Sequence, residues 1–114
     1  ANYKEDNYPN TKHYAILKNE SVVSALTIIE RTTNKKKSAQ LRGMFTVQKE
    51  LKKGYGSLLI DKVSFKLKKE NMSLIWCNSR INVIDFYKKN KFKEIGKTFS
   101  INLLGDHKKL IRKL

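Results

Sequence analysis

The fold of this chain is decided by one stretch, Leu41-Arg-Gly-Met-Phe-Thr-Val47 followed by Gln48-Lys-Glu-Leu-Lys-Lys-Gly54-Tyr55-Gly56-Ser57. A run typical of a strand leads into a short loop with two glycines, and a helical pattern begins directly after it. Glycines permit left-handed turns and a close approach of the backbone to a ligand. The unpaired amides and the dipole of a helix N-terminus favour an anion there. The stretch therefore predicts a cradle for a pyrophosphate group.

The glycine pair does not match two common nucleotide-binding motifs. It lacks the third glycine of the dinucleotide fingerprint and the GK[ST] ending of a P-loop. A nicotinamide enzyme and an NTPase are therefore disfavoured. Taken alone, a G-x-G before a helix is explained equally well by a structural turn.

The rest of the chain predicts two helices among strands. Leu59, Val63 and Leu67 recur at i, i+4 and i+8, which predicts a helix over residues 54–70 that ends with a left-handed Asn71. We expect strands over 13–17, 21–30, 39–47, 73–78, 92–103 and 108–114, a charged turn over 31–38, a turn over 105–107 and a second helix over 81–89, with Ile81, Val83 and Ile84 facing inward. The order β-β-β-α-β-α-β-β predicts an α/β (α+β) sheet with one central crossover.

Length and charge restrict the alternatives. We expect the 114 residues to form a single domain over 1–114, with an extended arm over 1–12. The net charge of +15 has two interpretations: compositional drift in a lysine-rich chain, or a functional field that attracts an anion. The arginines that base readout favours are few, namely Arg31, Arg42, Arg80 and Arg112. Nucleic acid is therefore not the expected partner.

The remaining composition predicts a cytoplasmic protein. Cys77 is the only cysteine, so no internal disulfide can form, and no Cys/His spacing predicts a metal site. The apolar runs are too short to span a bilayer, and the polar first ten residues do not resemble a signal peptide.

Several linked motifs resemble the GNAT superfamily of acetyl-CoA-dependent N-acetyltransferases. Leu51-Lys-Lys-Gly54-Tyr-Gly56 aligns with the Q/R-x-x-G-x-G/A motif of that family. Trp76-Cys-Asn-Ser-Arg80 resembles its fifth strand, and Asp85-Phe86-Tyr87-Lys-Lys-Asn-Lys-Phe92 resembles its FY-x-K-x-G-F helix end. The resemblance covers residues 39–114 well and is looser from His13 onward.

The chain departs from the family pattern at three places. Leu51 stands where the family has Gln or Arg. Lys91 stands where it has Gly, so we expect Asn90 to take the left-handed conformation instead. The usual first strand and helices, which wall the acceptor site, have no counterpart before His13. Either the protein is a minimal version, or another chain supplies the wall. A homodimer is expected, since the His13 strand would be an open sheet edge.

The resemblance implies where acetyl-CoA binds. The backbone of Phe45, Thr46 and Val47 would bind the pantetheine arm as an added strand would, provided that the strand from Ser73 splays away. The pyrophosphate would be held by the amides of Lys52, Lys53, Gly54, Tyr55, Gly56 and Ser57, with the two lysines adding positive charge. Asn78 is expected either to contact ligand amides or to serve in ordinary strand-end hydrogen bonding.

The resemblance also implies how the reaction proceeds. The amine would attack the thioester directly in a ternary complex, with Tyr87 as the general acid for the leaving thiolate. Glu30 is the first candidate for the general base and His107 the second. Each role has a structural alternative: Tyr87 as a core aromatic, His107 as a turn cap. His13 is expected to be structural, and Cys77 has no orienting His pattern that would make it a nucleophile.

Two other functions stay open at this stage. One is a basic module that grips nucleic acid, and the other is a relative that binds coenzyme A without turnover. The acceptor amine is equally open among polyamines, antibiotics, amino acids and protein amines.

Overall fold

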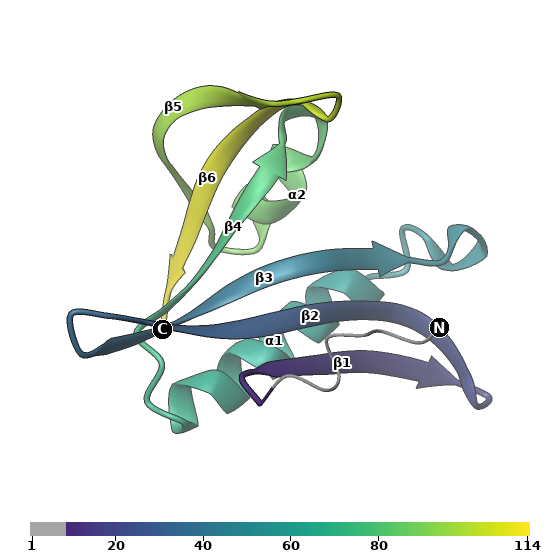
Figure 1. Cartoon of the computed structure of the whole chain (residues 1–114). Coiled ribbons are helices and arrows are strands. Elements are labelled where there is room, and N and C mark those ends of the chain that lie inside the picture. Colours follow the sequence, from purple (N-terminus) through teal and green to yellow (C-terminus); the bar gives the residue numbers. More distant parts are fainter. Residues whose placement is uncertain (1–8) are drawn as a thin grey trace.

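Six strands form one mixed sheet in the computed structural model, which describes residues 9–114 (Figure 1). The elements are β1 (Thr11–Lys18), β2 (Ser21–Thr33), β3 (Lys36–Thr46), α1 (Tyr55–Lys69), β4 (Leu74–Arg80), α2 (Ile84–Lys89), β5 (Lys93–Ile101) and β6 (Gly105–Lys113). Short 3-10 turns precede the two helices, η2 (Gln48–Glu50) before α1 and η3 (Ile81–Val83) before α2. The element order and the α+β class confirm the prediction.

The strands lie in the order β1-β2-β3-β4-β6-β5. Within this part of the chain the β3–β4 pair is parallel and the other four pairs are antiparallel. The parallel pair requires a crossover, which α1 supplies between β3 and β4. This is the single central crossover that the sequence predicts.

Helix α1 buries its apolar stripe against the first half of the sheet. Leu59, Val63 and Leu67 are each at most 3% exposed, as their spacing predicts. They belong to one core cluster with Leu26 of β2 and Leu41 of β3. In Figure 1, α1 lies behind β1–β3 and α2 lies behind β4 and β6. The helix-free face of the sheet is the near one in this view.

The two halves of the sheet separate between β3 and β4. These strands share only the pairs Ala39 with Ile75 and Gln40 with Trp76 in the described chain. Beyond Gln40, β3 continues beside β2 while β4 continues beside β6, and the two strands diverge (Figure 1). A bulge in β3 at Gly43 (φ 59°) inserts one extra residue opposite β2, which increases the local twist. The expected splaying of the strand from Ser73 is confirmed.

The predicted charged turn over 31–38 is wrong. β2 and β3 continue through these residues as a long hairpin, and only Asn34 and Lys35 form the turn, with φ of 52° and 64°. Two successive left-handed residues match the twist of a tight hairpin. The charged side chains are compatible with a strand here because they are exposed.

The predicted turn over 105–107 is also wrong. The chain reverses over residues 102–104, where the Leu104 amide donates to the Ile101 carbonyl at 2.9 Å. Gly105 already pairs with Ile101, and His107 with Phe99, so these residues begin β6. The conformational freedom of Gly105, which has φ of 85°, is used immediately after the turn.

The second helix is shorter than predicted. Residues 81–83 form η3, where Ile81 and Val83 are exposed, and of the three expected inward residues only Ile84 is buried. Lys91 itself takes the left-handed conformation (φ 72°) that was expected of Asn90. The Asn90 side chain instead donates to the Phe86 carbonyl at 2.8 Å.

The predicted arm over 1–12 is partly outside the described residues, which begin at residue 9. Thr11 and Lys12 already belong to β1, so the arm ends earlier than expected. At the other end of α1, Asn71 is left-handed (φ 66°), as predicted. Neither α1 nor α2 is long and apolar enough to cross a membrane.

Candidate active site

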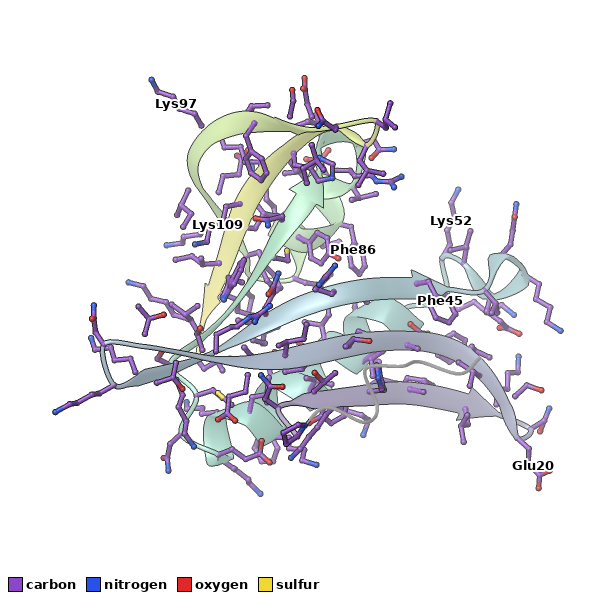
Figure 2. The ribbon with its side chains drawn as sticks, in the orientation of Figure 1. Glu20, Phe45, Lys52, Phe86, Lys97 and Lys109 are labelled. Atoms are coloured by element: carbon purple, nitrogen blue, oxygen red, sulfur yellow. The ribbon has the colours of Figure 1, made fainter. Side chains whose placement is uncertain are left out.

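A pocket of about 250 Å³ lies where β3 and β4 separate. Its lining includes residues 40–43 of β3, Cys77 and Asn78 of β4, Tyr87 of α2, and Ile101 and His107 of the β5–β6 hairpin. Figure 2 shows Phe86 on α2 close to the space between these two halves, with Phe45 further along β3. We call this pocket the gap. It brings together three of the predicted site residues: Asn78, Tyr87 and His107.

The main chain of β3 alternates its polar groups between β2 and the gap. The Val47 amide donates to the Val23 carbonyl at 2.8 Å, and the Phe45 carbonyl accepts from Ser24 Oγ at 3.0 Å. Since successive residues of an antiparallel strand point opposite ways, the N–H and C=O of Thr46 face away from β2. Of the three predicted residues, Thr46 thus faces the gap, whereas the main chains of Phe45 and Val47 face β2.

The same alternation adds Met44, which the sequence interpretation missed. It lies two residues before Thr46, just after the bulge at Gly43. To predict Met44, one would have to count alternate residues back from Val47. That count requires the position of the bulge and the pairing of Val47 with Val23, and an alternating sequence pattern shows neither.

The two glycines of the loop serve different purposes. Gly54 is the N-cap of α1 with φ of 83°, and a Cβ added there would meet no atom within 4 Å. It is required by conformation. Gly56 is buried, and its Cβ would lie 3.1 Å from Phe86 Cζ and 3.3 Å from Met44 Cε. It is required by close packing between α1, β3 and α2.

The first turn of α1 presents backbone amides without intrahelical acceptors. The Leu58 amide makes the first such bond, to the Gly54 carbonyl at 3.0 Å. The preceding amides of Tyr55, Gly56 and Ser57 have no position four residues earlier within the helix to bond to. No side chain caps this end, and the first turn contains no acidic residue. The end is therefore open to an anion.

Tyr87 is buried (8% exposed) between two aromatic rings, those of Phe86 and Phe92, each with a centroid 5.3 Å away. Burial, and secondarily the nearby Cys77, raise the pKa of the Tyr87 phenol well above its usual range. The phenol therefore stays protonated at neutral pH. Burial also raises the pKa of Cys77 to about 12, so this thiol is not ionised for nucleophilic chemistry.

His107 enters the same gap from β6 and is 4% exposed. Its Nδ1 lies 2.9 Å from the Gly105 carbonyl oxygen, which can only accept. The proton of the neutral ring is therefore on Nδ1, and Nε2 carries a lone pair. Phe99 packs beside the ring at a centroid distance of 6.0 Å. The predicted turn-cap role is replaced by a fixed ring on a strand.

Comparison with known proteins identifies the family. The chain matches the model of the Acetyltransferase (GNAT) family over residues 1–92. It belongs to the GNAT acetyltransferases. The uncharacterized N-acetyltransferase YitI of Bacillus subtilis (strain 168) is 29% identical over 108 residues, which cover 92% of this chain and 72% of that protein.

Two solved structures place the fold in the same family. An acetyltransferase of the GNAT family from Staphylococcus aureus Mu50 is 27% identical, with a TM-score of 0.76 over 96% of this chain and 73% of that one. A putative streptothricin acetyltransferase from Bacillus anthracis str. Ames, solved in complex with acetyl coenzyme A, is 20% identical, with a TM-score of 0.79 over 95% of this chain and 65% of that one.

The two lysines of the GNAT loop differ in their surroundings. Lys52 is exposed and left-handed (φ 64°), and Figure 2 shows its side chain projecting from the end of the molecule. Lys53 donates to Glu50 at 2.9 Å, and Lys18 of β1 binds the same carboxylate at 3.3 Å. The Lys53 hydrogen bond is the main cause that lowers the pKa of Glu50. Lys53, which is expected to add positive charge at the loop, is therefore partly neutralised by Glu50.

Glu50 was missed by the sequence interpretation. It is 6% exposed, and its ion pair with Lys18 connects the segment before the glycine loop to β1. A charged residue between apolar and basic neighbours gives no local signal of burial, since Lys18 is distant in sequence and becomes a neighbour only through the β1–β2–β3 sheet.

Glu30 lies elsewhere in this GNAT fold. It forms an ion pair with Lys37 at 3.4 Å and lines another pocket, of about 260 Å³, together with Tyr14 and Glu70. Glu70 is the C-cap of α1, so this pocket is at the opposite end of the helix from the glycine loop. The structure thus does not bring Glu30 to Tyr87 and His107, and we remove it from the site.

His13, which is expected to be structural, lies on β1. His13 Nδ1 is 2.7 Å from Thr27 Oγ1 on the neighbouring strand, which fits the structural role expected of it. Within residues 9–114 no group of three or more His, Cys, Asp or Glu side chains is arranged to hold a metal ion.

Proposed function

We propose that this chain transfers the acetyl group of acetyl-CoA to a primary amine by direct attack in a ternary complex. The observation that carries the proposal is the early separation of β3 and β4, after two pairs, beside an uncapped helix N-terminus. Family membership supports acetyl transfer in general. The residues of the gap support the more specific steps below.

The main chain would hold the cosubstrate. Thr46 and Met44 supply unpaired N–H and C=O groups along β3, which suit the amides of a pantetheine arm. The open amides of Tyr55, Gly56 and Ser57 suit the pyrophosphate, and Lys52 adds an unpaired positive charge. Asn78, exposed on the β4 side, is the proposed side-chain contact to a ligand amide.

Acetyl-CoA supplies the thioester whose acetyl group moves to the amine. When the amine nitrogen bonds to the carbonyl carbon and the carbon–sulfur bond breaks, the amine must lose a proton and the sulfur must gain one. His107 Nε2 would accept the first proton, directly or through water, which is supported by the contact of Nδ1 with the Gly105 carbonyl. Tyr87 would donate a hydrogen bond to the sulfur, which is supported by its position in the lining of the same pocket.

The raised pKa of Tyr87 defines its contribution. A phenol that holds its proton more tightly than usual is a weaker acid than a free thiol, whose pKa is about 8.5. It therefore acts as a hydrogen-bond donor while negative charge develops on sulfur, and the released thiolate takes its proton from water. Positioning of the two substrates provides the remaining rate enhancement.

Thermal unfolding with and without acetyl-CoA tests the binding step. Saturation at ~100 times the dissociation constant should stabilise the fold by about 2.7 kcal/mol. Steeply salt-dependent binding to DNA with no response to acetyl-CoA would instead support the nucleic-acid alternative.

A Tyr87→Phe variant tests the chemical step. It should lower kcat by roughly a hundredfold, the usual loss when one hydrogen-bond donor to a developing negative charge is removed, while acetyl-CoA still stabilises the fold. Tyr14→Phe is the matched control, because it removes a hydroxyl that is also buried but lies in the pocket at the other end of α1. Equal kcat for the two variants would remove Tyr87 from the mechanism.

A further inference from the structure

A second groove, of about 680 Å³, lies on the far side of the β3–β4 junction from the gap. It runs between the β2–β3 hairpin and the exposed face of β4, β6 and β5. Its lining includes four apolar side chains, Leu74, Trp76, Ile95 and Ile111, and three cationic ones, Arg31, Lys36 and Lys109. This volume is in the range of small-molecule sites.

Trp76 and Ile111 share the face of the sheet that carries no helix. Ile75 and Cys77 are buried in the core, so Trp76 between them points to the opposite face. Ile111 is its cross-strand partner on β6. Trp76 is only half-buried, so the indole is available as the floor of the groove.

One of the three cations lies over this floor. Lys109 Nζ lies 4.7 Å from the centre of the Trp76 ring. Figure 2 shows Lys109 on β6 above the β2–β3 hairpin, and Lys97 at the far edge of β5, pointing away. None of the described residues that line the groove is Asp or Glu. The pocket that contains Glu30 and Glu70 shows that the chain does place acids in pockets elsewhere.

One hydrogen bond joins the groove to the gap. Arg31 donates from Nε and Nη2 to Gln40 Oε1, at 3.1 and 2.9 Å. Gln40 lines the gap, and it pairs with Trp76 across the last β3–β4 rung. The groove therefore begins where the gap ends. The Arg31 guanidinium keeps further N–H donors for a ligand.

We propose that this groove binds the body of the acceptor and selects an amine that also carries a carboxylate and an apolar group, as a hydrophobic amino acid does. The inference rests on the proposed function. Three cations without an acid repel a polyamine and attract a carboxylate, while the indole floor takes the apolar part. The junction at Gln40 then directs the amine toward the gap.

Trp76 fluorescence provides a direct test, because this is the only tryptophan of the chain. The wild-type protein is titrated with L-phenylalanine, with phenethylamine, which lacks the carboxylate, and with spermidine. We expect a saturable change with phenylalanine, and at least fivefold weaker binding of the other two. The Trp76 indole N–H resonance in an NMR titration reads the same occupancy.

Two charge-matched variants localise the effect. Lys109→Met should weaken phenylalanine binding about fivefold or more, since a direct cation–carboxylate contact is lost. Lys97→Met removes the same charge from an exposed site outside the groove and should bind as the wild type does. The inference is overturned if phenethylamine or spermidine binds as well as phenylalanine, if the two variants behave alike, or if a second copy of the chain covers the groove and phenylalanine fails to bind.

The titration needs no acetyl-CoA, so the two proposals fail separately. If phenylalanine binds but acetyl-CoA does not stabilise the fold, only the proposed function is contradicted. If acetyl-CoA stabilises the fold but spermidine is acetylated in preference to phenylalanine, only the groove inference is contradicted.

Discussion

The two ends of helix α1 are built differently. At the C-terminal end, the Met72 amide bonds to the Leu67 carbonyl and the Asn71 amide to the Lys68 carbonyl, each at 3.1 Å. This is a complete Schellman motif around the left-handed Asn71. At the N-terminal end, Gly54 is also left-handed, but no side chain caps the amides that follow it.

The charged residues also differ between the two ends of α1. Lys66, Lys68 and Lys69 lie in the last turn, where cations complement the helix dipole. The first turn would be stabilised by an acid and has none. At the C-terminal end the chain itself satisfies the last carbonyl groups of the helix. At the N-terminal end the first amides keep their N–H donors, and the positive end of the helix dipole stays available for a bound anion. The difference separates a structural terminus from a binding terminus on the same helix.

The largest difference between the two ends of α1 is expected from Ser57→Glu. The carboxylate would lie in the first turn and reach back to the N-cap amide, which closes the open end. We expect acetyl-CoA affinity to fall by roughly tenfold to a hundredfold through charge repulsion, while the ligand-free helix becomes about 0.3–1 kcal/mol more stable. Calorimetric titration and urea unfolding measure the two effects.

Lys68→Glu is the mirror control at the other end of α1. An acid in the last turn opposes the dipole and should cost about 0.3–1 kcal/mol, with acetyl-CoA affinity unchanged. If both variants weakened acetyl-CoA binding equally, overall charge rather than the helix N-terminus would govern the affinity.

The left-handed residues offer a smaller and more exact comparison. Gly54→Ala places a Cβ at positive φ, so we expect the free energy of unfolding in urea to fall by about 1–2 kcal/mol, and Asn71→Ala should lower it by less, because it only replaces a residue that tolerates positive φ with one that tolerates it less well. Only Gly54→Ala should also weaken acetyl-CoA binding, because only that turn aims amides at the ligand. A loss of binding in Asn71→Ala would show that α1 responds as one unit.

The smallest effect is expected from Glu50→Gln. Its neighbours Lys18 and Lys53 lower the pKa of Glu50, so the carboxylate stabilises the fold above its ordinary pKa, and this contribution is lost as the pH falls through the lowered value. The variant should therefore have a lower urea midpoint than the wild type at pH 7. The two midpoints should converge once acid has protonated Glu50, and a constant difference down to pH 2 would contradict the ion-pair role.

Local patterns predicted much of the fold. The i, i+4, i+8 spacing of Leu59, Val63 and Leu67 identified α1 and its buried face, because a helix is periodic within one short segment. The boundaries were less accurate where lysines extend strands, as at residues 31–38. There the hairpin is decided by cross-strand pairing, which a list of exposed residues does not reveal.

The site shows the same limit in its individual residues. Tyr87 and His107, which are distant in sequence, were both predicted, but only the fold shows that they share a pocket and that Glu30 does not. Glu50 and Met44 escaped prediction because the first depends on a partner in β1 and the second on the bulge at Gly43.

The glycine loop, the helix that follows it and the order of the elements could all be predicted from the amino-acid sequence, because each is encoded by neighbouring residues. Three features appear only in the folded chain: β3 and β4 separate after Gln40, particular main-chain groups of β3 face the gap, and basic and apolar side chains from five strands line one groove. These features depend on the twist and register of strands that are distant in the chain, and no local pattern contains them.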